Sequence, residues 1–178
     1  MAYTNFYGFI DADYVKNNST VCGQMEDSFI EPFIQIAQEK YIIDILSSGL
    51  YNDMQLKVEA YLNSGTAIPS NYVSLLNNYV KNCLLHWVLY EMIPQISFHI
   101  GNIGIIQKNS EYGTSSDISG TEYIRNTIRS TAQFYHDRLK KHMVAEGKTT
   151  YPLYNESYNN TDGTLAKDSD TNLGIYFE

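Results

Sequence analysis

The sequence predicts a mainly α-helical protein, namely a four-helix antiparallel bundle with one inserted β-hairpin and an extended C-terminal arm. Apolar residues recur about every 3.6 residues through four long segments. Near residues 96–107 this period changes to about 2, and beyond residue 150 the chain becomes rich in Asn, Ser, Thr and Asp. We therefore divide the 178 residues into an N-terminal segment (1–25), a helical core (26–150) and an extended C-terminal tail (151–178).

Start and stop signals bound the helices of the core. Ser48-Gly49 is a C-terminal stop for the first helix, because glycine readily adopts the left-handed conformation that ends helices. Pro94 disfavours helical geometry in the residue before it, and Ser119-Gly120-Thr121-Glu122 fits a capping box that starts the last helix. The expected helices run from Asp27 to about Ser48, Leu50 to Leu62, Ser70 to Ile93, and Thr121 to about Ala145, with Gly147 as the last stop.

The change of period favours a β-hairpin near residues 96–107. Ile96, Phe98 and Ile100 alternate with polar residues, and a second apolar run follows Gly101-Asn102, two residues that suit a tight turn. A two-stranded hairpin on its own is only marginally stable in water. A hairpin with so many isoleucines is therefore expected to pack against another sheet or another chain.

The two ends of the chain give weaker signals. In residues 1–25 we expect a short helix or turn near Asp11 to Lys16 and an extended piece near Thr20 to Gly23. Ordering the tail costs roughly 1–2 kcal/mol for each residue, whereas burying a large apolar side chain returns about 1.5–3 kcal/mol. The tail is therefore expected to be mobile in an isolated subunit and to become ordered against a neighbour.

Composition argues against several classes of protein. A formal net charge of −8 is unsuited to a general nucleic-acid binder, which needs a basic surface. The first six residues lack the basic and apolar regions of a secretory signal, and no apolar stretch reaches the length of a membrane span. The two cysteines, Cys22 and Cys83, fit a reducing compartment rather than a disulfide framework.

The charges are unevenly distributed along the chain. Residues 1–64 hold nine acidic residues and three lysines, whereas residues 121–148 hold six basic residues and three acidic ones. The acidic and basic regions can pair within one subunit, or they can meet between subunits, where charge complementarity sets the register of the contact. Both readings are compatible with the sequence.

No combination of residues indicates catalysis. His86, His99, His136 and His142 do not have the spacing of a zinc motif, and Cys83 lies among apolar residues that raise a thiol pKa. The turn around Gly101-Asn102 lacks the lysine of a phosphate-binding loop. We therefore expect no enzyme activity, no metal and no cofactor.

Several apolar and aromatic patterns follow one another in a characteristic order along residues 26–154. They are Ile36-Ala37-Gln38-Glu39-Lys40-Tyr41-Ile42, then Leu84, His86 and Trp87 with Tyr90-Glu91-Met92-Ile93-Pro94, then the Gly101 to Ile106 hairpin, then Tyr123-Ile124-Arg125 with Ala132-Gln133-Phe134-Tyr135, and finally Tyr151-Pro152-Leu153-Tyr154. In this order they resemble the head-tail connector (adaptor or ring) proteins of tailed bacteriophages, most closely those of crAss-like phages.

The resemblance implies a virion structural protein without catalysis. Identical subunits would form a ring, expected to be twelvefold, below the portal protein, where the ring extends the DNA channel and links it to neighbouring tail or ring proteins. DNA would only pass through non-specifically, and an acidic wall suits such passage because it does not hold phosphates. The implied location is the head-tail junction of the virion, and the host cytoplasm during assembly.

Contacts between subunits are expected from the hairpin, the basic last helix and the tail. The predicted interface residues are Phe98, Ile100, Ile103 and Ile105 in the hairpin, Arg125, Arg129 and Arg138 on the helix, and Leu173, Ile175, Tyr176 and Phe177 in the tail. An alternative function is that of a small cytoplasmic helical binding or regulatory protein whose hairpin docks one partner.

Overall fold

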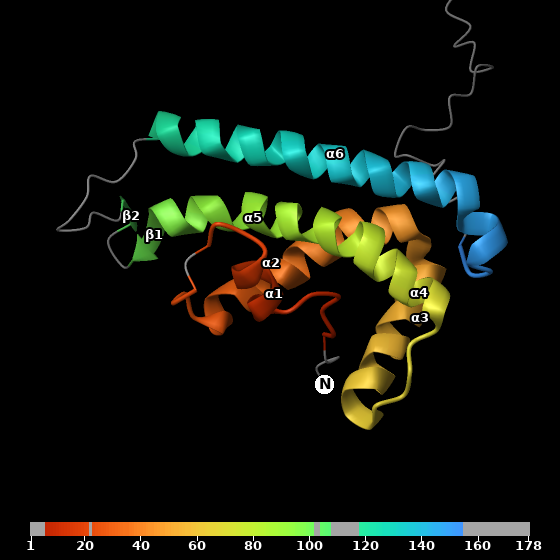
Figure 1. Ribbon diagram of the computed structural model, residues 1–178. Coiled ribbons are helices and arrows are strands. Elements are labelled where there is room, and N and C mark those ends of the chain that lie inside the picture. The colour runs from red at the N-terminus through yellow and green to blue at the C-terminus, as the bar shows by residue number, and fades with distance from the viewer. Residues whose placement is uncertain (1–5, 22, 102–103, 108–117, 155–178) are drawn as a thin grey trace, which may run out of the picture.

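The computed structural model of the chain describes residues 6–21, 23–101, 104–107 and 118–154, and it confirms the mainly α-helical class (Figure 1). Within these ranges the elements are α1 (Ala12–Asn17), α2 (Asp27–Ala37), the π-helical turn η1 (Gln38–Ile42), α3 (Ile43–Ser64), α4 (Ser70–Leu75), the π-helical turn η2 (Leu76–Val80), α5 (Lys81–Ser97), β1 (Phe98–Gly101), β2 (Gly104–Gln107) and α6 (Ile118–Thr150).

Helix α5 lies at the centre of the fold. Figure 1 shows α6 running antiparallel along one side of α5, with α1 and α2 on the other side. The second half of α3 turns away from this stack and projects, with the loop to α4, as an arm. The layers enclose one cluster of apolar side chains, whose fully buried members include Ile30, Leu46, Leu84, Met92 and Leu139.

One continuous helical stretch comprises α2, η1 and α3 and is broken once, at Ser47. The Ser47 backbone has φ 64° and ψ 154°, a conformation that residues other than glycine rarely adopt. The predicted stop at Ser48-Gly49 adjoins this break. Gly49 is also required by packing, since a Cβ atom there would lie 2.9 Å from the carbonyl oxygen of Leu153.

Helix α5 is longer than predicted. The predicted end at Ile93 is wrong, because Pro94 lies inside the helix and α5 continues to Ser97. A proline removes one backbone donor and disfavours, without forbidding, helical geometry before it, so its effect is small near a helix end. The chain becomes extended only at β1, which pairs antiparallel with β2 so that Phe98 faces Gln107.

The end of α6 corrects the predicted boundary of the C-terminal tail. Gly147 does not stop the helix, which continues to Thr150. Tyr151 and Tyr154, which the prediction places in the tail, are only 2% and 6% exposed. The Tyr151 ring stacks on Tyr72 at a centroid distance of 5.9 Å. Residues 151–154 therefore belong to the folded core, and residues 155–178 of the predicted tail lie outside the described residues.

The N-terminal segment contains the predicted short helix. In α1 the carboxylate of Asp11 caps the helix by accepting a hydrogen bond of 2.7 Å from the backbone N–H of Tyr14. The extended piece predicted near Thr20 to Gly23 is wrong for the residues described there, which form bends and turns. Cys22 lies outside the described residues.

The lack of a side chain at Gly147 leaves room for the ring of Tyr154, and a substitution can test this. A Cβ atom at position 147 would lie 2.5 Å from Cδ1 of the Tyr154 ring, so Gly147→Ala must displace that ring. The alanine gains about 1 kcal/mol of helix propensity, but the lost burial of a large side chain costs about 1.5–3 kcal/mol. We expect a net loss of about 1 kcal/mol in urea unfolding. In a Tyr154→Ala background the same substitution should raise stability, and a stabilised single variant would contradict the contact.

Candidate interaction surfaces

Aromatic rings contribute to the contact that α6 makes with the rest of the fold. Trp87 of α5 stacks on Tyr41 of η1, with ring centroids 3.8 Å apart and planes 8° from parallel. Trp87 also meets His136 of α6 edge-on at 6.1 Å. Two further stacks join α6 to the chain before it, His86 on Tyr135 and Tyr79 on His142. These ring contacts fix the rotation of α6 and so determine which of its residues face outward.

Two of the three arginines predicted for the partner face lie over tyrosines of their own chain. The guanidinium carbon of Arg125 is 4.3 Å from the ring centre of Tyr90, and that of Arg138 is 5.3 Å from Tyr79. A cation over an aromatic ring is attracted by the negative face of the ring. Arg129 is exposed and borders a shallow depression of about 500 Å³ on α6. Of the three, Arg129 is therefore the best placed to meet a partner.

The other predicted interface residues are not brought together by the described part of the chain. The backbone of Phe98, Ile100 and Ile105 lies in the paired strands β1 and β2. The remaining five residues, Ile103, Leu173, Ile175, Tyr176 and Phe177, fall outside the described residues. The contact role of all eight stays a prediction.

A partly buried acidic group ties η1 to α5. The Glu91 carboxylate accepts hydrogen bonds from Lys40 Nζ at 2.6 Å and from the Tyr41 hydroxyl. Burial alone would raise the pKa of Glu91, but these two hydrogen bonds and the charges of Lys40 and Arg125 lower it overall. The carboxylate is thus held ionised by its own chain, which is a structural role and not that of a general acid.

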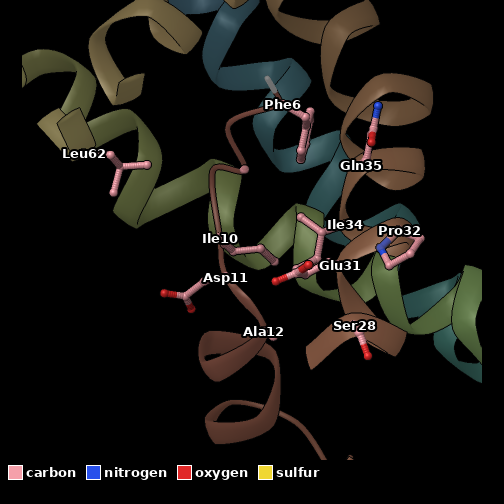
Figure 2. Close-up of a pocket in the computed structure, with 11 residues that line it drawn as sticks. Phe6, Ile10, Asp11, Ala12, Ser28, Glu31, Pro32, Ile34, Gln35 and Leu62 are labelled. Carbon is pink, nitrogen blue, oxygen red and sulfur yellow. The ribbon is translucent and has the colours of Figure 1, made fainter. Parts of the chain in front are cut away.

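The first surface that could receive a partner is a groove on the side of the molecule away from α6. Residues 6–12, α2 and the end of α3 enclose a cavity of about 590 Å³, which Figure 2 shows in close-up. We call it the N-terminal groove and define it by Phe6, Ile10, Asp11, Glu31, Ile34 and Leu62. Leu62 is 61% exposed, although it borders an apolar floor. The groove therefore combines apolar area with two carboxylates.

One buried side chain, Gln38, holds the wall of the N-terminal groove in place. Its Oε1 accepts a hydrogen bond of 2.7 Å from the Phe9 N–H, and its Nε2 donates to the Tyr7 carbonyl at 3.3 Å. Nε2 also donates to the Tyr51 hydroxyl at 3.2 Å. The amide thus pairs the backbone of the N-terminal segment with η1 and α3, which positions Phe6 beside the groove.

The second surface is the solvent-facing side of α6. We call it the α6 outer face and define it by Tyr123, Phe134, Lys141 and Val144, with Arg129 at its border. Tyr123 and Phe134 are 75% and 63% exposed, and Val144 is 54% exposed. Figure 1 shows that α6 and the elements of the N-terminal groove lie on opposite sides of α5. One side of the molecule therefore presents apolar area with two carboxylates, and the other presents apolar area with Lys141 and Arg129 beside one exposed acid, Asp137.

Sequence reasoning missed the residues that build the groove. Phe6 and Leu62 lie in segments without a clear pattern, and their proximity depends on contacts distant in the chain. Gln38 gave a usable signal, because a polar residue interrupts the apolar stripe of the first predicted helix. A buried amide at such a position needs hydrogen-bond partners, and the N-terminal segment supplies two of them.

Two histidines of the α5–α6 contact predict how stability depends on pH. Burial lowers the pKa of His86 and of His136, and for His136 the neighbouring Asp137 partly opposes this effect. Unfolded imidazoles titrate near pH 6.5, so below that pH the unfolded chain binds more protons than the folded one. The free energy of unfolding should fall between pH 7.5 and pH 5.5 in urea titrations. His136→Phe keeps a ring at that position and should reduce the fall, whereas stability that rises toward pH 5.5 would contradict the burial of these imidazoles.

Reactive groups are few in the described ranges. No set of three or more His, Cys, Asp or Glu residues is arranged there to hold a metal ion. Burial raises the pKa of the Cys83 thiol to about 12, which confirms the predicted effect of its apolar surroundings and makes it a poor nucleophile at neutral pH. The helices of these ranges also include none with the length and apolar character of a bilayer span.

Comparison with known proteins adds a family but no activity. A search of curated proteins and a search of solved structures gave no match. A family model described as a family of unknown function (DUF6712) matches residues 42–164, which is more than half of the chain. The chain therefore belongs to this family, DUF6712.

Proposed function

We propose that this chain is the structural adaptor subunit of a phage head-tail connector. Identical subunits form a ring, expected to be twelvefold, below the portal protein, and the ring extends the DNA channel and links it to neighbouring tail or ring proteins. The order of apolar and aromatic patterns along residues 26–154 resembles such connectors and supports the proposal. The chain would reside at the head-tail junction of the virion, after assembly in the host cytoplasm.

The observation that carries the proposal is the placement of two unlike surfaces on opposite sides of α5. The N-terminal groove presents Asp11 and Glu31, and the α6 outer face presents Lys141 with Arg129 at its border. When unlike patches on opposite sides of one subunit meet head to tail, a rotation that closes produces a ring. Complementary charge then sets the register of neighbouring subunits.

The finer features of the predicted fold enter the proposal as elements of assembly. In it, the four-helix arrangement forms the body of the subunit, the inserted hairpin covers an adjacent subunit, and the C-terminal arm reaches the next one. The hairpin contributes Phe98, Ile100, Ile103 and Ile105, and the arm contributes Leu173, Ile175, Tyr176 and Phe177. A two-stranded sheet gains stability when another chain covers it, which favours contact at this place.

A second candidate function is a small helical binding or regulatory protein. The N-terminal groove favours it, because about 590 Å³ falls within the range of pockets that bind a single small partner. Such a protein needs no ring and would stay small in the presence of portal protein.

Native mass measurement and negative-stain imaging separate the two functions. The purified chain should be small alone and should form rings when mixed with the portal protein of the same phage. Arg129→Glu with Lys141→Glu should abolish these rings because the basic patch then repels the acidic groove. Arg129→Lys with Lys141→Arg keeps both charges and is the matched control. Absence of rings with the unaltered chain, under conditions where the portal is intact, would refute the connector proposal.

A further inference from the structure

Exposed side chains on α6 follow a definite order. The N-terminal half of the α6 outer face carries the aromatic residues Tyr123 and Phe134, which are 75% and 63% exposed. The C-terminal half carries exposed basic residues, Lys141 on the outer face and Lys148 in the last turn of the helix. A partner that runs from the C-terminal end of α6 toward its N-terminal end would therefore meet positive charge first and aromatic rings second.

The sequence after residue 154 has the complementary order. Residues 155–178 contain five acidic residues and one lysine. The acidic residues Asp162, Asp168 and Asp170 come first, and the apolar run Leu173-Gly174-Ile175-Tyr176-Phe177 follows them. Negative charge would thus meet the basic half of α6, and the apolar run would meet the aromatic half.

The place where the described chain ends allows this pairing. Tyr154, the last described residue, packs against Gly147 in the last turns of α6. Phe134 lies thirteen residues before Gly147, which corresponds to about 20 Å along the helix axis. The eighteen residues from 155 to 172 would span about 20–25 Å as a flexible chain. The reach of this linker therefore matches the distance from Tyr154 to the aromatic half.

We propose that residues 170–178 dock on the α6 outer face of their own subunit while that subunit is free. Ile175, Tyr176 and Phe177 cover the exposed ring of Phe134. The side chain of Glu178 faces Arg129, beside the depression of about 500 Å³ that Arg129 and Phe134 line. Asp137 also lines this depression, so Arg129 supplies its positive charge against one acid of the same helix.

We expect a mobile tail because of the conformational free energy needed to order all of its residues at once. Docking of nine residues leaves the linker free, so most of that cost is not incurred. A tether whose average length matches the span also raises the effective concentration of the segment to about the millimolar range. A contact with a dissociation constant near 1 mM would then be about half occupied.

The inference concerns the free subunit and holds whether or not the connector proposal does. In a connector, the docked segment would cover the same face that a neighbouring subunit uses. Assembly would then require its displacement, which gives a physical reason for a subunit to remain small until a portal is present. Once displaced, the segment would be available to a neighbour.

Photo-crosslinking in the full chain tests the proposal. The variant Phe177→p-benzoylphenylalanine keeps an aromatic ring, and irradiation should link it mainly to the α6 peptide that contains Phe134, in a product of monomer mass. Phe134→Ala should reduce the yield of this product about three- to tenfold, as expected for the loss of one aromatic contact. Sodium chloride at 1 M should reduce it too, because salt screens the charge pairing.

The matched control is Ile36→Ala, which removes an exposed apolar side chain of α2 away from α6 and should leave the yield unchanged. Crosslinks spread over the surface, or a yield that Phe134→Ala does not alter, would overturn the proposal. A product of dimer mass linked to α6 would overturn the assignment to the same subunit, because the segment would then come from a second copy.

Discussion

Trp87→Ala should destabilise the protein by about 3–5 kcal/mol, a large share of the stability of a typical domain. Trp87 is 5% exposed, stacks on Tyr41 at 3.8 Å and meets Tyr90 and His136 edge-on at 5.5 and 6.1 Å. The substitution therefore opens a cavity among η1, α5 and α6. Urea unfolding must be followed by circular dichroism, because Trp87 is the single tryptophan and its fluorescence is lost in the variant.

Tyr61→Ala is the control for this prediction. Tyr61 is 53% exposed on the projecting arm, and loss of an exposed aromatic side chain should change the free energy of unfolding by less than about 0.5 kcal/mol. A cost below about 1 kcal/mol for Trp87→Ala would show that Trp87 does not hold the three elements together.

Gln38→Leu should cost about 2–3 kcal/mol, although leucine is close to glutamine in size. The Gln38 side chain is fully buried, and without its amide the Phe9 N–H and the Tyr7 carbonyl lose their partner. A buried polar group left without a partner costs about 1–3 kcal/mol. The Tyr51 hydroxyl is less affected, because it also accepts a hydrogen bond from Gln55.

Hydrogen exchange locates the effect of this substitution. Exchange of the Phe9 amide should become faster in Gln38→Leu, because its acceptor is removed and the wall of the N-terminal groove loosens. Gln35→Leu is the matched control, since Gln35 lies on an exposed part of α2 and bonds only to Glu39 among the described side chains. Equal protection of Phe9 in both variants would contradict the anchoring role of Gln38.

Helices were predictable from the sequence because their apolar faces repeat locally. The break near Ser48-Gly49 and the cap of α1 also depend on residues close in the chain, and both lie at or next to the predicted positions. The errors involve residues whose role is set by distant contacts. Gly147 has the sequence pattern of a helix stop, yet its lack of a side chain accommodates Tyr154.

The candidate surfaces were harder to predict than the helices. Sequence alone does not fix which side of the last helix is buried. The apolar residue Ile124 is 48% exposed, because the ring contacts of Tyr135, His136 and His142 set the rotation of α6. Arg125 is turned toward Tyr90 for the same reason. The polarity of the surfaces, acidic early and basic late, was visible in the sequence, but their placement on opposite sides of α5 depends on the tertiary fold.

The π-helical turns η1 and η2 have a consequence for related sequences. A π turn accommodates one residue more than an α turn, so each can arise by a single insertion into a regular helix. Deleting one residue between Gln38 and Ile42 would restore regular α geometry in this turn and would shift Tyr41, which lies within η1, away from its stack on Trp87. Family members with a one-residue gap in this stretch should therefore carry compensating changes at the position of Trp87.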